Sequence, residues 1–233
     1  MANDKIKNMT VGEIVAEDFR AASIFKNAGI DFCCGGKKKL DQICSETGTD
    51  PDELVKKLNE MRGARNTTVH NYKEWEPGFL CDYIVNTHHK YVLKTMPELL
   101  QYTSKISEVH GERHPELKEV AELFAAINRE LLQHLKNEEE VLFPAIKDFL
   151  KTGSENSRKI ILSEISRLSD EHEFAGGAMD KINHITNGYL VPADGCNTYH
   201  VTFSLLEQFE DDLHTHVHLE NNVLFPKFIK SAN

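Results

Sequence analysis

The sequence lacks any apolar run that approaches the ~20 residues needed to span a membrane. Its polar start, Met1-Ala-Asn-Asp-Lys5, also lacks the apolar segment of a secretory signal peptide. We therefore expect a cytoplasmic protein that makes no use of a membrane.

Positive charge and cysteine are also scarce. Lys and Arg total 27 against 37 Asp and Glu, which gives a net charge of −10 and argues against nucleic acid as a partner. Five cysteines, an odd number in a chain of 233 residues, do not resemble the disulfide framework of a secreted protein. Apolar residues make up 40% of the chain, which is enough for a real core.

The chain carries one motif twice. His134-Leu-Lys-Asn-Glu138 continues into Val-Leu-Phe-Pro144, and His216-Val-His-Leu-Glu220 continues into Val-Leu-Phe-Pro226. Positions i and i+4 lie on the same face of a helix, so each copy directs an imidazole and a carboxylate to one spot. Two copies that face each other could hold a pair of metal ions.

The sequence predicts an all-α protein of two parts. Residues 1–62 form a small helical domain, residues 63–74 a polar linker, and residues 75–233 an antiparallel four-helix bundle with gaps near 111–115, 151–157 and 187–197. In the small domain, the capping box Thr10-Val-Gly-Glu13 predicts a helix to about Ala28. A second helix is expected over 37–47, and a third after Asp50-Pro51.

The histidines of the bundle fall on the apolar seams of its four predicted helices. Adjacent His88 and His89 allow two registers for the first helix, and the His89 register is the more apolar. His89, His134 and His172 lie at similar distances from the intervening turns, so antiparallel helices bring the seam ligands to one height. The seams are Val85, His89, Val92, Met96, Leu99; Leu117, Val120, Phe124, Ile127, Leu131, His134, Glu138, Val141; Ile161, Ile165, Leu168, His172, Ala175, Met179, Ile182; and Leu206, Phe209, Leu213, His216, Glu220, Val223.

A lone histidine on a seam is usually a hydrogen-bonded core residue, but four with two glutamates indicate a metal site. Two buried carboxylates without partners would cost several kcal/mol, and metal ions remove that cost. Imidazole with carboxylate suits iron, manganese or zinc. Six side chains cannot saturate two six-coordinate ions, so positions remain for small molecules.

Other histidines and acids fit this site less well. We expect His214 and His218 to face outward or beside the seam, His110 to lie at a helix end, and Glu139 and Glu140 to be solvated. Gly176-Gly177, one turn beyond His172, leaves two explanations open: a path to the metals, or close helix packing.

These motifs, with Asp31-Phe-Cys33-Cys34-Gly-Gly near the N-terminus, resemble the iron–sulfur cluster repair di-iron proteins, which join a hemerythrin-like domain to a Cys-Cys-Gly-Gly domain. The resemblance covers nearly the whole chain. It implies two non-haem, oxo-bridged iron ions and repair of clusters damaged by nitric oxide or peroxide. It assigns as ligands the residues that the seams also select: His89, His134, Glu138, His172, His216 and Glu220. Oxygen-carrying hemerythrins use five histidines, which argues against simple oxygen carriage here.

Cys33 and Cys34 are candidates for redox chemistry or iron transfer. They lie at a turn before three lysines, where both sulfurs could be exposed and positive charge would favour thiolate. Two incidental thiols beside a solvated helix start remain the alternative.

The expected partners are damaged iron–sulfur proteins, NO or O₂, and a second copy in a homodimer. Whether the chain is an enzyme stays open, because NO reduction at the di-iron centre and redox or gas sensing are alternatives to iron donation.

Overall fold

The computed structural model describes residues 6–63 and 71–229, and no strand occurs among them. The all-α prediction is therefore confirmed. The chain divides into two compact units, one of residues 1–80 with 215–233 and one of residues 81–214. The expected domain limits at 62 and 74 stay predictions, and most of the expected linker, residues 64–70, lies outside the described residues.

The first helix of the small domain is shorter than predicted. α2 (Val11–Glu17) begins at the expected capping box, where Glu13 N donates to Thr10 Oγ1 at 3.2 Å and Thr10 N to Glu13 Oε2 at 3.1 Å. It ends at Asp18, whose backbone is extended and whose carboxylate accepts a hydrogen bond from the Arg20 backbone N–H. The Arg20 side chain donates to the same carboxylate and lowers the pKa of Asp18. α3 (Ala21–Asn27) follows, so the prediction of one continuous helix was wrong.

The second predicted helix begins later than expected. Gly35–Lys37 form a short 3₁₀ turn, and α4 spans Leu40–Thr47. The two residues before α4 are extended instead, because Lys38 O accepts from Val11 N at 3.0 Å and Lys39 forms a β-bridge with Thr10. α5 (Pro51–Gly63) starts where Asp50-Pro51 predicted it, and Asp52 N donates to Asp50 Oδ1 at 2.8 Å. A short 3₁₀ turn, η2, covers Tyr72–Glu74.

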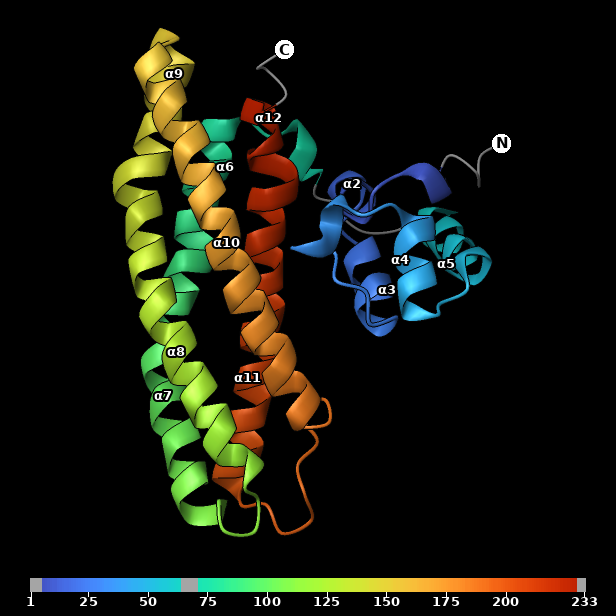
Figure 1. Cartoon of the computed structure of the whole chain (residues 1–233), viewed down its shortest axis with the longest axis vertical. Helices are drawn as coiled ribbons and strands as arrows, with labels where there is room; N and C mark the ends of the chain where they lie inside the picture. The colour runs from blue at the N-terminus through green and yellow to red at the C-terminus, as the bar shows by residue number, and fades with distance from the viewer. Residues whose placement is uncertain (1–5, 64–70, 230–233) are drawn as a thin grey trace. The chain divides into compact units, whose positions relative to one another are not determined.

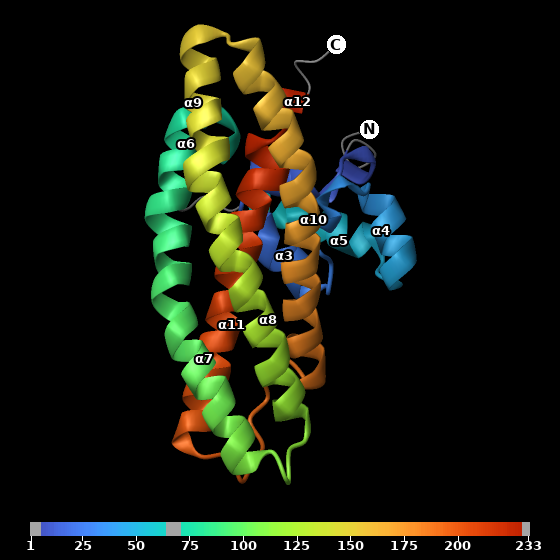
Figure 2. The same ribbon diagram turned by 60° about the vertical axis from the view of Figure 1, so that its left-hand side comes forward.

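Four long helical runs form the bundle, and three of them contain a π-helical segment. The long helices α7, α8, α10 and α11 lie side by side, with successive runs antiparallel (Figures 1 and 2). The runs are α6 (Pro77–Ile84), π segment η3 (Val85–His89) and α7 (Lys90–His110); α8 (Glu116–Asn137), π segment η4 (Glu138–Leu142) and α9 (Phe143–Thr152); α10 (Glu155–Ile185); and α11 (Asn197–His218), π segment η5 (Leu219–Leu224) and α12 (Pro226–Ile229).

The predicted seams are buried, with two exceptions. Val85 is half-buried, and Val141 is 39% exposed. Val141 lies inside the π segment η4, where each turn holds about one residue more than an α-helical turn. The extra residue rotates the chain, so that Leu142 takes the core position with no exposed surface.

The two glycines of α10 do not both line a packed interface. Gly176 is buried, whereas Gly177 is exposed, and a Cβ atom there would meet nothing within 4 Å. Close helix packing therefore does not explain Gly177.

The connection from α10 to α11 opens with three residues in the left-handed region. Asn187, Gly188 and Tyr189 have φ values of 52°, 70° and 59°. This run ends α10 near the position where the sequence predicted a gap. The described helices include none that combines the length and apolar character required to cross a membrane.

Candidate metal centre

Four of the six predicted ligands come together within the unit of residues 81–214. His89 lies at the end of η3, His134 in the last turn of α8, Glu138 at the start of η4, and His172 in the middle of α10. Their side chains are at most 2% exposed. Glu138 Oε2 lies 3.3 Å from both His89 Nε2 and His134 Nε2, and His172 Nε2 lies 3.1 Å from His134 Nε2.

The outward nitrogens of two of these histidines contact carboxylates. His89 Nδ1 lies 2.8 Å from Glu139 Oε1, and His134 Nδ1 lies 2.8 Å from Glu171 Oε2. A carboxylate accepts hydrogen bonds, so in the neutral imidazoles Nδ1 carries the proton and Nε2 presents a lone pair to the interior.

In this tautomer, hydrogen-bond acceptors face one another in the interior of the site. The Nε2 lone pairs of His89 and His134 then face the Glu138 carboxylate, which is buried completely. Such an arrangement requires a cation between them or an additional proton on imidazole. The donor set, neutral imidazole with carboxylate and with outer carboxylates on the far nitrogens, is the one used by iron and zinc sites in proteins.

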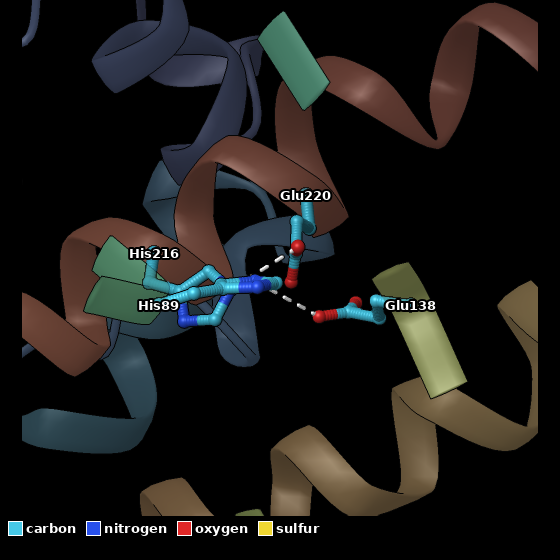
Figure 3. A group of neighbouring side chains, drawn as sticks. All are labelled: His89, Glu138, His216 and Glu220. Carbon is cyan, nitrogen blue, oxygen red and sulfur yellow. Dashed lines mark hydrogen bonds and ion pairs between the residues drawn. The ribbon is translucent and has the colours of Figure 1, made fainter. Parts of the chain in front are cut away.

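The second motif copy brings its own pair together. His216 Nε2 lies 3.1 Å from Glu220 Oε1, and both side chains are at most 1% exposed. Figure 3 shows this pair and the His89–Glu138 pair, each joined by a dashed line. The six predicted ligands form two groups, in each of which the ligand atoms lie within 4.8 Å of one another: His89, Glu138, His216 and Glu220, and His134, Glu138, His172 and Glu220. Glu138 and Glu220 belong to both groups.

Glu171 is itself held in place by a cation. Arg167, one helical turn earlier on α10, donates to Glu171 Oε1 through Nη1 and to Glu164 Oε2 through Nη2 at 2.7 Å. The hydrogen bond from His134 and the charge of Arg167 lower the pKa of Glu171. The carboxylate beside His134 is therefore ionised at neutral pH.

Known proteins match the chain over nearly its full length. A family model described as "Hemerythrin HHE cation binding domain" matches residues 82–228, and a "Domain of Unknown function (DUF542)" model matches residues 7–62. The iron–sulfur cluster repair protein ScdA of Staphylococcus epidermidis is 32% identical over 222 residues, covering 95% of this chain and 98% of that protein. The chain belongs to the iron–sulfur cluster repair protein family.

Two further members show the same extent of similarity. The iron–sulfur cluster repair protein YtfE of Yersinia pestis is 31% identical over 227 residues, and that of Pectobacterium atrosepticum is 30% identical over 224 residues. Each match covers 96% of this chain and 98% of the relative. The resemblance drawn from the two H-x3-E copies and the Cys-Cys-Gly-Gly segment is confirmed.

Sequence reasoning missed the outer carboxylates of this family member. Glu139 was expected to be solvated, and its side chain is 40% exposed, yet it contacts His89. Glu171 was not predicted to take part in the site, although it directly precedes the predicted ligand His172. The sequence does place an acidic residue next to Glu138 and another next to His172. This adjacency alone does not reveal which imidazole each carboxylate contacts.

The remaining histidines differ in their surroundings. His88 is 4% exposed, and its Nδ1 lies 2.9 Å from Asp212 Oδ1, so a carboxylate neighbour explains its burial. Of the two positions expected for His218, the outward one was wrong, because the side chain is fully buried with Phe19 and Phe32 in ring contact. Burial lowers the pKa of His218 to about 4 and keeps the ring neutral.

The cysteine pair is less accessible than expected. Cys33 is 3% exposed and Cys34 is half-buried, with their Sγ atoms 3.9 Å apart. Asp31 Oδ1 receives the backbone N–H groups of both residues and the Cys33 thiol at 3.1 Å. The neighbouring Cys34 sulfur and burial raise the pKa of Cys33, which disfavours the expected thiolate at this residue.

Asn222 holds the backbone of the same turn. Its Nδ2 donates to Cys33 O at 2.9 Å and to Phe32 O at 3.3 Å, within the unit that combines residues 1–80 and 215–233. Asn222 lies in η5, two residues after the predicted ligand Glu220. One π segment thus carries both a predicted ligand and a contact to the cysteine turn.

Proposed function

We propose that this protein repairs iron–sulfur clusters damaged by nitrosative or oxidative stress, by supplying iron from a two-iron centre in its bundle. The similarity to proteins named for iron–sulfur cluster repair supports this role over NO reduction or sensing. The single observation that carries it is the buried Glu138 carboxylate, faced by two imidazole nitrogens whose protons are directed outward.

We propose six protein ligands for two non-haem iron ions joined by an oxo-type bridge. One ion takes His89 and His216 and the other takes His134 and His172, with both glutamates shared, as the two groups of ligand atoms suggest. When bound, such a centre supplies ions that can be exchanged and positions that NO or O₂ can occupy.

The charge of the site favours release over storage. Two carboxylates contribute a charge of −2 toward two iron ions, and the other four proposed ligands are neutral imidazoles. A carboxylate-rich site would compensate more of the metal charge and hold the ions more tightly. We therefore expect at least one iron to be transferable to a damaged cluster in a recipient protein.

We propose that Cys33 and Cys34 take part in this transfer. Asp31 and the two sulfurs form a separate group whose ligand atoms also lie within 4.8 Å of one another. Because the neighbouring Cys34 sulfur and burial favour the protonated form of Cys33, a metal ion that displaces the proton would be a better partner for it than a small oxidant. The recipients are cytoplasmic iron–sulfur proteins, and a homodimer is the expected assembly.

The test is recovery of a dehydratase whose cluster has been damaged by NO. The iron-loaded parent protein should restore activity and lose iron in proportion, whereas His134→Leu should bind less iron and restore little. His184→Leu, a change at an exposed histidine of α10, is the matched control and should behave as the parent does.

The cysteines are tested in the same assay. Cys33→Ser/Cys34→Ser should retain the iron content of the parent and repair more slowly, and Cys44→Ala should match the parent. Full repair by His134→Leu would disprove the iron-donation proposal. Full repair by the double cysteine variant would disprove only the role of the cysteines.

A further inference from the structure

Cys196 occupies the opposite end of the bundle from the metal centre. His110, which contacts it, is 21 residues after His89 in a continuous helical run, or roughly 30 Å at 1.5 Å per residue. Cys196 directly precedes the 22-residue helix α11, and its side chain is exposed to solvent. Its surroundings are therefore independent of the proposed iron ligands.

Cys196 lies at the amino end of α11. Tyr199 and Thr198, in the first turn of this helix, lower the pKa of the Cys196 thiol by hydrogen bonding. The first N–H groups of a helix are not used within the helix, and together they stabilise negative charge. The thiolate is the reactive form of cysteine.

A buried histidine completes the site. His110 is 4% exposed, and its Nε2 lies 3.2 Å from Cys196 Sγ. Arg113 Nη2 lies 3.5 Å from His110 Nδ1, and because arginine only donates, Nδ1 accepts and Nε2 carries the proton. His110 therefore directs an N–H at the sulfur. A histidine paired with an exposed cysteine at a helix start is the arrangement that activates a thiol.

The other charged groups near this pair are largely engaged with one another. Arg113 Nη1 lies 2.9 Å from Asp194 Oδ2, and His114 Nε2 lies 3.0 Å from Asp194 Oδ1. His114 Nδ1 is 3.3 Å from Glu116 Oε1. The acidic groups thus face Arg113 and His114, while His110 faces the sulfur.

We propose that Cys196 is a site of reversible thiol modification, with low-molecular-weight disulfides as its substrates. The Cys196 thiolate attacks one sulfur of the disulfide, a new S–S bond forms to Cys196, and the original S–S bond breaks. The departing half leaves as a thiolate and takes a proton from solvent, so no further oxidant is consumed.

The fold favours a lasting mixed disulfide over onward exchange. The other cysteine in the unit of residues 81–214 is Cys81, which is buried in α6. It precedes His110 by 29 residues along the same helical run, roughly 40 Å away. A cavity of about 200 Å³ is lined in part by His114 and Tyr199, whose rings also contact His110.

The experiment treats the full-length protein with glutathione disulfide and follows each cysteine by peptide mass spectrometry over pH 5–9. Cys196 should be modified at least tenfold faster at pH 7 than the thiol of a free peptide of residues 192–200. His110→Gln should slow this reaction about three- to tenfold and move its pH midpoint upward, because the imidazole N–H that faces the sulfur is removed. His200→Gln, at an exposed histidine one turn along α11, should react as the parent does.

A second variant tests the proposal in case His110→Gln does not fold. Thr198→Val removes a hydroxyl that lowers the pKa of the Cys196 thiol while preserving side-chain shape, and should also slow the reaction. A rate at Cys196 equal to that of the free peptide, or unchanged rates in both folded variants, would overturn the proposal. Iron content should not change on modification, which separates this result from a failure of the proposed repair function.

Discussion

The two outer carboxylates at the metal-facing histidines differ in how firmly they are held. The Glu139 side chain is 40% exposed, whereas the Glu171 side chain is 27% exposed and also receives hydrogen bonds from Arg167. A carboxylate fixed by a second partner keeps the imidazole in one orientation and one tautomer. Of the two, Glu171 is therefore the stronger determinant of metal affinity.

Replacing Glu171 by Gln should weaken iron binding about 10- to 100-fold, the range expected when an outer carboxylate at a ligating histidine is lost. The amide can still accept a hydrogen bond, but it no longer carries the negative charge that makes His134 a stronger donor. Competition with a chelator of known affinity measures the change.

Glu164→Gln is the matched control, because Glu164 lies on the same helix and also pairs with Arg167. Its iron affinity should stay within twofold of the parent. Equal losses in both variants would show that the effect runs through Arg167 and not through the bond to His134.

At the residue scale, sequence predicted the buried seam histidines better than their surroundings. His134 and His172 follow an apolar period of three and four residues, and this period reports burial directly. The Glu171 contact to His134 and the burial of His218 depend on residues elsewhere in the chain. No local pattern around these residues encodes those contacts.

The π segments are the elements that sequence periodicity could not anticipate. η3 ends at His89, η4 starts at Glu138, and η5 contains Glu220, so three of the helical runs change their pitch at a proposed ligand. A prediction with a constant period of 3.6 residues places Val141 inside, but the structure buries Leu142. π segments are frequent at functional sites in helices.

One substitution in helix α10 should stabilise the protein and leave the metal centre intact. Gly177→Ala should raise the free energy of unfolding by about 1 kcal/mol, because alanine is the better helix former. Its Cβ atom meets nothing within 4 Å, so no repacking offsets the gain. Urea denaturation of the iron-loaded protein measures the difference.

Gly153→Ala provides the opposite case. Gly153 has φ +68° at the end of α9, a conformation that costs an alanine about 1 kcal/mol or more. This variant should be less stable than the parent. A destabilised Gly177→Ala with normal iron content would show that the glycine serves a purpose in α10 beyond backbone geometry.

For the whole molecule, metal and folding are expected to be linked. The folded chain buries Glu138 and Glu220 completely, and burying charge is unfavourable without a compensating cation. Iron that binds only the folded state stabilises it by about 2.7 kcal/mol at a free concentration of 100 Kd. The iron-loaded protein should therefore melt at a higher temperature than the chelator-treated protein.

Differential scanning calorimetry in one buffer, with and without chelator, measures this difference. In the double variant His134→Leu/His216→Leu, the two melting temperatures should converge, because the site no longer binds iron well. Equal melting temperatures for both forms of the parent would contradict a metal-organised core.

For the whole molecule, the all-α class and the gaps between the bundle helices could be predicted from the sequence. The helices of the small domain were predicted less well. Gaps near 111–115 and 187–197 are marked by residues that end helices, and the long apolar periods between them are unambiguous. Among the short helices, Asp18 interrupts the first one by accepting hydrogen bonds from Arg20. Such side-chain contacts outweigh local helix preference in an element of seven residues.

The π segment at Glu138 also has a consequence for how the gene can change in length. A π segment is equivalent to an α-helix with one inserted residue, so the loss of one codon within 138–142 would restore an α-helix. The residues after it would keep their orientation relative to those before it, because the π segment turns the chain about as far as an α-helical segment one residue shorter. Phe143, which stacks on His89, and Ile146 would stay in the core. The loss of one codon within α8, which has no surplus residue, would instead turn everything after it by about 100°, so two deletions of equal size in one helical run would have very different outcomes.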